Sequence, residues 1–266
     1  MLRIIAAALA ITIATPLAGH AQNAAEKADI DRALARGQLI YAYDQAAWHG
    51  TDAMLKKIEH PEKVIGGWIV DGPASAPTLI FFDQDQAEPH AAYIAEFRDN
   101  RMTAERVVAA DSPERMLSAE RRAMIAALEK GKKAWQDAKP LFCSKSSPNS
   151  VVLPPERPGG PHLVYIMTPQ TENRAYPLGG HFRVEIGADG SVGASRGFTK
   201  SCITMPAEAG KEAAALFITH MLDPVPTEIH VFTARSAGVP VAVGTTSNDM
   251  MWWVTGDRIE GQKLKK

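Results

Sequence analysis

Four strand-length segments follow one another in the first half of the chain, and short runs of turn-forming residues separate them. The segments cover residues 63–70, 77–82, 91–98 and 102–109. The separators are rich in Asp, Asn, Gly and Pro, which favour tight turns. Because antiparallel strands can be joined by such short connections, the second, third and fourth segments are expected to pair as an antiparallel meander.

Two helical regions accompany these strands. Apolar residues recur at spacings of three and four between residues 30 and 58, which is typical of one helix face. Gly37 and Gly50 interrupt this pattern, so the sequence predicts either two helices or one broken helix. A further helix is predicted over residues 119–138, with Ser118 as its N-cap.

The second half of the chain again mixes strands with a helix. A helix is predicted over residues 206–222, and the sequence Asp189-Gly190 predicts a hairpin. Strands are predicted over residues 162–167, 181–186, 191–198, 227–234, 239–243 and 250–254. This order does not alternate strand with helix, so it argues against βαβ units. The predicted fold class is α+β, with an antiparallel sheet or sheets and helices packed on one face.

Composition divides the chain into five parts. Residues 1–21 are predicted to be a signal peptide, 22–143 an N-terminal α+β half and 162–258 a C-terminal α+β half. Residues 144–161 are rich in Pro, Gly and Ser and form either a linker or a long loop. Residues 259–266 are expected to be a tail.

The first 21 residues predict export. A cation at Arg3 precedes an uncharged apolar run over residues 4–14, and small residues flank a cleavage site after Ala21. His20 occupies the position of the lipid-bearing cysteine of a lipoprotein, and no second apolar stretch of membrane-spanning length follows. We therefore expect a periplasmic or secreted protein without a stable membrane anchor.

Charge and motifs exclude several classes of function. The 29 basic and 30 acidic residues leave no net positive field to attract nucleic acid. The chain has no Gly-x-Ser-x-Gly motif, which argues against a serine hydrolase of that kind. No glycine-rich phosphate loop precedes a helix, so nucleotide chemistry is not expected and no cofactor is predicted.

The chain has two cysteines, Cys143 and Cys202. In an oxidising compartment two cysteines in one chain most often pair, so a disulfide is predicted. The alternatives are two separate buried thiols, or a nucleophile at Cys202.

Histidines and a glutamate gather in the second half of the sequence. If residues 227–234 form a strand, Glu228 and His230 share one face, with His220 close by and His181 opening another strand. These residues could form a metal site from His220, Glu228 and His230, or a metal-free ligand pocket that includes His181. They could also be structural, and their spacing matches no zinc motif.

A second candidate site lies in the N-terminal helical region. Asp44 falls on the apolar face between Tyr41 and Trp48, where a carboxylate is costly unless it has a partner. Asp44 therefore either tethers a neighbouring strand or lines a pocket together with Trp48 and His49. The predicted ligand-binding residues are Asp44, Trp48, His49, His181, Glu228 and His230.

The sequence Ser201-Cys202-Ile203-Thr204 resembles the catalytic segment of L,D-transpeptidases, exported enzymes of the cell wall. The resemblance implies that Cys202 is a nucleophile and His181 its base. The chain departs from the family pattern, because Thr199-Lys200-Ser201 replaces its Ser-His-Gly and Thr204 replaces its arginine. A disulfide at Cys202 would exclude this mechanism.

Over stretches such as residues 42–49, 179–184 and 226–232, the chain resembles a group of uncharacterised exported proteins of Gram-negative bacteria. The resemblance implies export and carries no activity. The sequence therefore predicts a periplasmic protein that binds a small molecule or an envelope component, or is envelope-associated, without catalysis. The alternative is a periplasmic hydrolase or transferase that uses Cys202 or the His220, Glu228 and His230 site.

Overall fold

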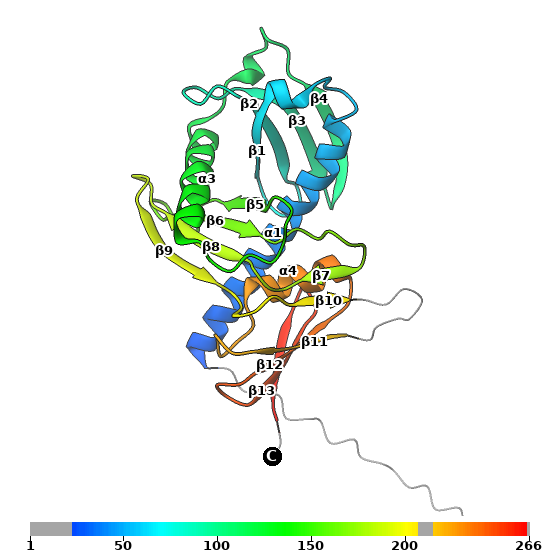
Figure 1. The fold of residues 1–266 in the computed structure, drawn as a ribbon, viewed down its shortest axis with the longest axis vertical. Helices are drawn as coiled ribbons and strands as arrows, with labels where there is room; N and C mark the ends of the chain where they lie inside the picture. The colour runs from blue at the N-terminus through cyan, green and yellow to red at the C-terminus, as the bar shows by residue number, and fades with distance from the viewer. Residues whose placement is uncertain (1–22, 207–214, 265–266) are drawn as a thin grey trace, which may run out of the picture.

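The structure is a computed structural model that describes residues 23–206 and 215–264. The predicted signal peptide lies outside these residues, and so does the part of the predicted helix over 207–214. Within the described residues the α+β class is confirmed. Three four-stranded sheets follow one another along the long axis of the molecule, and helix α1 (Ala24–Met54) runs beside them (Figure 1).

The first sheet is the predicted antiparallel meander. Its strands pair in the order in which they occur along the chain, and the short helices α2 and η1 flank it. The strands are β1 (Ile65–Asp71), β2 (Thr78–Asp83), β3 (Ala91–Arg98) and β4 (Arg101–Val107), and the helices are α2 (Pro61–Val64) and η1 (Pro113–Arg115).

The second sheet is antiparallel, in the order β5-β6-β8-β9. Its strands are β5 (Asn149–Leu153), β6 (His162–Met167), β8 (Phe182–Ile186) and β9 (Val192–Gly197). The predicted hairpin joins β8 to β9, and Gly190 takes a φ of 76° at its turn. The predicted linker or loop over 144–161 contains β5. Prolines and glycines surround this strand, but its residues Val151, Val152 and Leu153 are buried in the core.

The third sheet has the order β11-β12-β13-β14. Its strands are β11 (Leu216–His220), β12 (Val241–Thr245), β13 (Met250–Val254) and β14 (Ile259–Lys263). Strand β14 lies in the predicted tail and pairs with β13. Strands β11 and β12 are parallel and are connected through helix α4 (Glu228–Ala237), so one βαβ unit occurs in a fold predicted to have none. A separate ribbon pairs β7 (Ala175–Pro177) with β10 (Thr204–Pro206).

Two predictions for the second half are wrong within the described residues. Residues 228–237 are helix α4 and not a strand, although Ile229, Val231 and Thr233 are β-branched. Thr227 and His230 form a capping box at its start, and Gly238 ends it with a φ of 67°. Tertiary packing and these caps outweigh the strand propensity of the branched residues.

Residues 216–220 are strand β11 and not the end of a helix. Leu216, Ile218 and His220 are buried, whereas Phe217 and Thr219 are exposed, which is the two-residue period of a strand. The apolar residues that suggested one face of a helix lie on opposite faces of this strand.

Helix α1 is a single continuous helix, so the predicted interruption is wrong. Gly37 and Gly50 lie at close approaches to other elements. A Cβ atom at Gly37 would lie 2.5 Å from the Cβ of Val231 in α4, and one at Gly50 would lie 2.1 Å from the Cδ2 of Leu79 in β2. The glycines therefore allow packing, and they do not end the helix.

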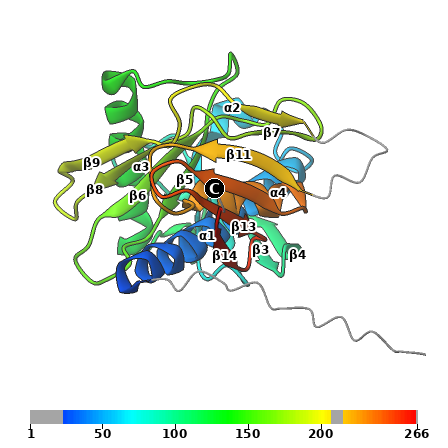
Figure 2. The same ribbon diagram turned by 90° about the horizontal axis from the view of Figure 1, so that it is seen from below.

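Helices α1 and α3 (Ala119–Ala138) belong to different parts of the core. Leu79 and Phe81 of β2 pack in the cluster that contains the α1 residues, and Ile80 and Phe82 pack in the cluster of α3. Strand β6 is divided in the same way. Helices thus cover both faces of these strands, where the sequence indicated one face. Helix α4 contacts α1 as well as β12 and β13, and Figure 2 shows it beside the third sheet.

The predicted disulfide between Cys143 and Cys202 is present, with a Cα–Cα distance of 5.4 Å. It links the segment after α3 to the segment before β10 across 59 residues. Closing a loop of this length contributes about 4 kcal/mol in the chain-entropy model. Among the described residues, no helix has both the length and the apolar composition needed to cross a membrane.

Candidate functional site

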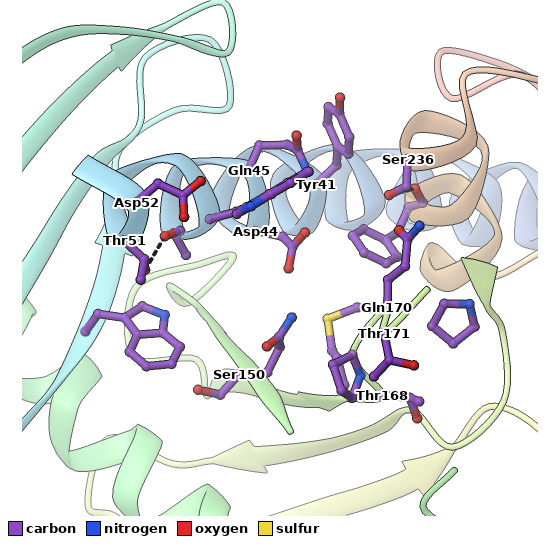
Figure 3. Close-up of a pocket in the computed structure, with 18 of the residues that line it drawn as sticks. Tyr41, Asp44, Gln45, Thr51, Asp52, Ser150, Thr168, Gln170, Thr171 and Ser236 are labelled. Carbon is purple, nitrogen blue, oxygen red and sulfur yellow. Dashed lines mark hydrogen bonds between the residues drawn. The ribbon is translucent and has the colours of Figure 1, made fainter. Parts of the chain in front are cut away.

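A cleft of about 1060 Å³ lies between α1, the beginning of β1 and the second sheet. The segment from Met167 to Pro177 and helix α4 complete its walls. Figure 3 shows Asp44, Gln45 and Thr51 on the α1 side and Ser150 and Thr168 on the opposite side. The cleft therefore lies where the first two sheets and α4 meet along one side of α1.

Aromatic side chains from five elements form much of the cleft wall. They are Tyr41 and Trp48 of α1, Trp68 of β1, Phe81 of β2, Tyr176 of β7 and Phe232 of α4. The rings of Trp68 and Phe81 pack 6.2 Å apart. Trp48 is 60% exposed and lies at the rim. Walls of this kind suit the apolar body of an organic ligand.

Asp44 is a partly buried carboxylate within this apolar cleft. Figure 3 shows its side chain directed from α1 into the cavity. Burial raises its pKa from 3.8 to about 6, while hydrogen bonds with the side chains of Gln45 and Asn149 act in the opposite direction. The carboxylate is thus mostly ionised at neutral pH, and one amide on α1 and one at the start of β5 favour its charge.

The other charged residues of the cleft are acidic too. They are Asp52, Glu62 and Glu172, and all three are exposed. Among the described residues that line the cleft there is no Lys, Arg, His or Cys. The nearby guanidinium of Arg235 lies over the ring of Tyr41 at 5.7 Å and is bound to Asp257 and the carbonyl of Gly256. The charge of the cleft lining is therefore negative.

The structure places two of the predicted N-terminal residues in the cleft and a third beside it. Asp44 and Trp48 both line the cavity. The amide of Asn149 in β5 is near enough to influence the pKa of Asp44, so this carboxylate lies beside a neighbouring strand as well as in the pocket. His49 does not line the cavity. It is exposed, and its ring stacks on Trp48 at 5.1 Å.

His181 lies behind the cleft wall and not in it. Its Nδ1 accepts a hydrogen bond from the Thr168 amide at 3.3 Å, and its Nε2 lies 2.9 Å from the carbonyl of Pro177. Burial lowers the pKa of His181 to about 4, although the hydrogen bond with Pro177 opposes this effect. The neutral imidazole therefore fastens the two ends of the segment from Thr168 to Pro177, which forms one side of the cleft.

His220, Glu228 and His230 do not share one site. The rings of His220 and His230 pack edge to face, 4.8 Å apart, but His220 bonds Asp223 at 2.8 Å and His230 accepts from the Thr227 amide at 2.9 Å. Burial lowers the pKa of His230 to about 3. Because residues 228–237 form a helix, Glu228 points away from both histidines toward other partners.

Glu228 lies at a smaller recess of about 320 Å³ in which opposite charges are paired. Its Oε1 accepts hydrogen bonds from the Tyr165 hydroxyl at 2.9 Å and the Arg183 guanidinium at 2.7 Å. At the same recess Arg196 forms two hydrogen bonds with Asp223. The bonds from Arg196 and His220 outweigh the effect of burial and hold the pKa of Asp223 well below its usual range.

Neither predicted reactive centre of the second half is assembled. In the described part of the chain, no group of three or more His, Cys, Asp or Glu side chains is placed to hold a metal ion. The Sγ atom of Cys202 is bonded to Cys143, so it is not the free thiolate that a transpeptidase mechanism needs.

Sequence reasoning missed most of the cleft lining. The polar residues Ser150, Thr168, Gln170 and Thr171 come from β5 and from the segment after β6. No spacing in the sequence connects them to α1. The apolar face of α1, interrupted by Asp44, was the signal that located one wall.

Comparison of the chain with protein-family models, with curated proteins and with solved structures finds no match.

Proposed function

We propose that this protein is an exported binding protein without catalysis, and that the cleft beside Asp44 holds a small organic molecule. The observation that carries the proposal is the lining of the cleft. Aromatic walls surround a volume of about 1060 Å³, and a few polar groups converge on it. Ligand pockets in proteins have this size and this combination of apolar walls with a few orienting polar groups.

The chemistry of the lining favours binding over covalent catalysis. Ser150 and Ser236 carry hydroxyl groups, but no described residue of the lining is a histidine or lysine that could activate them. The Ser236 hydroxyl donates to the carbonyl of Phe232 at 2.9 Å. The proposal therefore assigns the lining to recognition.

Export is part of the proposal. The charge, apolar run and small residues of the first 21 positions support cleavage after Ala21, which would give a periplasmic protein that begins at Gln22. A disulfide between Cys143 and Cys202 is compatible with an oxidising compartment outside the cytoplasm.

Titration with prodan, an uncharged naphthalene dye whose emission depends on polarity, tests the binding site. The protein is purified from the periplasm and compared with Ala47→Trp, which places an indole on the α1 wall of the cleft. We expect saturable blue-shifted emission with the unaltered protein. Affinity should fall about tenfold or more in Ala47→Trp, because the indole occupies ligand volume.

Ala28→Trp is the matched control, since Ala28 is an exposed residue of the same helix and does not line the cleft. This variant should bind the dye as the unaltered protein does. Absence of saturable binding, or equal binding by Ala47→Trp, would overturn the proposal. Circular dichroism and thermal unfolding of each variant establish that it is folded before the titrations are compared.

A further inference from the structure

We infer that the ligand of the cleft is an organic cation, an amine or quaternary ammonium group on an aromatic or aliphatic body, and that Asp44 is its counter-ion. This inference rests on the proposed function and names the ligand class of the same site. Three features of the cleft support it: the negative charge of the lining, the unused hydrogen-bond acceptor capacity of Asp44, and the aromatic walls.

Every charged residue that lines the cleft is acidic. The other titratable groups that line the same cleft as Asp44 are Tyr41 and Asp52 of α1, Glu62 of α2, Glu172 of the segment before β7, and Tyr176 of β7. Strands β1, β2 and β5 and helix α4 contribute no titratable side chain to the described lining. The cleft therefore attracts cations and repels anions, most strongly at the partly buried Asp44, where solvent screens charge least.

Asp44 has acceptor capacity left over. An ionised carboxylate offers about four lone-pair sites, and the side-chain partners of Asp44 are the two amides of Gln45 and Asn149. Its side chain is directed into the open cavity (Figure 3). An ammonium group placed there would form a charge-assisted hydrogen bond, which is shorter and stronger than a neutral one.

The aromatic walls complete the argument. A cation within about 6 Å of an aromatic ring is attracted by the negative face of that ring. Trp48, Trp68, Tyr176 and Phe232 line the same cavity as Asp44. A carboxylate and aromatic rings in one cavity are a combination that recognises an organic cation, since the rings contact its body and also favour its charge.

Other ligand classes fit the cleft less well. A carboxylate or phosphate ligand would find no Lys, Arg or His among the described lining residues, and it would be repelled by Asp44. A neutral ligand would cover Asp44 and leave its charge without a partner in a drier environment, which costs free energy. A cation alone compensates that charge.

Three compounds with one ring system and different charges test the inference: tryptamine, tryptophol and indole-3-acetate, titrated by calorimetry at neutral pH. We expect tryptamine to bind about tenfold or more tighter than tryptophol, and indole-3-acetate to bind weakest. Asp44→Asn, a nearly isosteric change, should weaken tryptamine binding about tenfold or more and should not weaken tryptophol binding, because the neutral amide removes the cost of covering a charge.

Asp31→Asn is the matched control, because Asp31 is an exposed acid of the same helix that pairs with Lys27 outside the cleft. It should leave all three affinities unchanged. The affinity of the unaltered protein for tryptamine should also fall as the pH is lowered below about 6, where Asp44 takes up a proton. Asp44→Asn should lack this dependence.

Tryptophol or indole-3-acetate binding as tightly as tryptamine would overturn the inference, and so would equal tryptamine binding by Asp44→Asn. Either result can occur while prodan still binds and Ala47→Trp still blocks it, so the proposed function would stand with another ligand class. Loss of the prodan signal itself is the separate result that overturns the proposed function.

Discussion

At the scale of the residue, two effects on the Asp44 carboxylate oppose each other. The amide of Asn149, the first residue of β5, favours the ionised form. Partial burial penalises the ionised form, because fewer water molecules solvate the carboxylate. A residue that lowers stability in the free protein and gains a partner in the complex is typical of a binding site.

Asp44→Asn should therefore stabilise the unliganded protein at neutral pH. The native state keeps a proton on Asp44 up to a pKa of about 6, against 3.8 ordinarily, so the stability of the unaltered protein falls as the pH rises between these values. The full shift corresponds to about 3 kcal/mol at most, and the solvent contact of Asp44 reduces our expectation to about 1–2 kcal/mol.

Urea unfolding of both proteins across this pH range measures the effect. The difference in unfolding free energy should be small at pH values below 3.8 and should grow as the pH rises to about 6. A variant that is less stable than the unaltered protein at neutral pH would show that the hydrogen bonds of Asp44 outweigh its desolvation.

At the scale of the element, α1 joins the parts of the molecule through close contacts at glycine. Val231 and the carbonyl of Glu228 in α4 occupy the space where Gly37 would carry a side chain. The sequence could not reveal this contact, because the partner residues lie almost 200 positions further along the chain. Glycine in a helix lowers helix stability by about 1 kcal/mol relative to alanine. At Gly37 the lack of a side chain allows α1 and α4 to approach each other closely.

The stability of Gly37→Ala distinguishes a glycine that only weakens the helix from a glycine that the packing of α1 against α4 requires. If Gly37 only weakens the helix, alanine should stabilise the protein by about 0.5–1 kcal/mol. We expect the opposite, a loss of about 1–3 kcal/mol, because the new Cβ would lie 2.6 Å from a backbone oxygen that cannot rotate away.

Chemical denaturation of Gly37→Ala and Gly50→Ala measures both effects. Gly50→Ala should cost less, since its closest contact is the terminal methyl group of Leu79. A gain of stability at Gly37 would contradict the packing seen between α1 and α4.

At the scale of the whole molecule, Glu228 connects elements from both halves of the sequence. From the start of α4 it accepts hydrogen bonds from Tyr165 of β6 and Arg183 of β8, and Arg36 of α1 lies 3.9 Å from it. Arg36 also bonds Glu156 at 2.6 Å. This buried network holds α1, α4 and the second sheet in one arrangement, and the cleft walls depend on that arrangement.

Glu228→Ala should destabilise the protein by about 3–5 kcal/mol, because it leaves the buried charge of Arg183 with only the more distant Glu185, 4.0 Å away. Glu156→Ala is the control, since Glu156 is half exposed and also pairs with Arg36. Its loss should cost about 1 kcal/mol or less. Thermal and urea unfolding of both variants test this, and equal losses would show that burial of Glu228 adds nothing.

The sequence by itself determined the parts of this protein that depend on neighbouring residues. The short turn segments between successive strands specified the meander of the first sheet, and Asp189-Gly190 specified the hairpin of the second. The disulfide could be predicted because the chain has two cysteines. Asp44 was identified because a carboxylate stands out on the apolar face of a helix.

Tertiary structure alone decided which residues meet at the cleft and what several ambiguous segments become. Residues 228–237 are a helix because capping residues and packing against α1 outweigh their strand propensity, and that helix brings Phe232 to the cleft. Gln45 and Asn149 lie 104 positions apart and influence the pKa of the same carboxylate. Such meetings depend on the packing of sheets around α1, which no local spacing encodes, because contacts between distant segments are fixed only when the whole core forms.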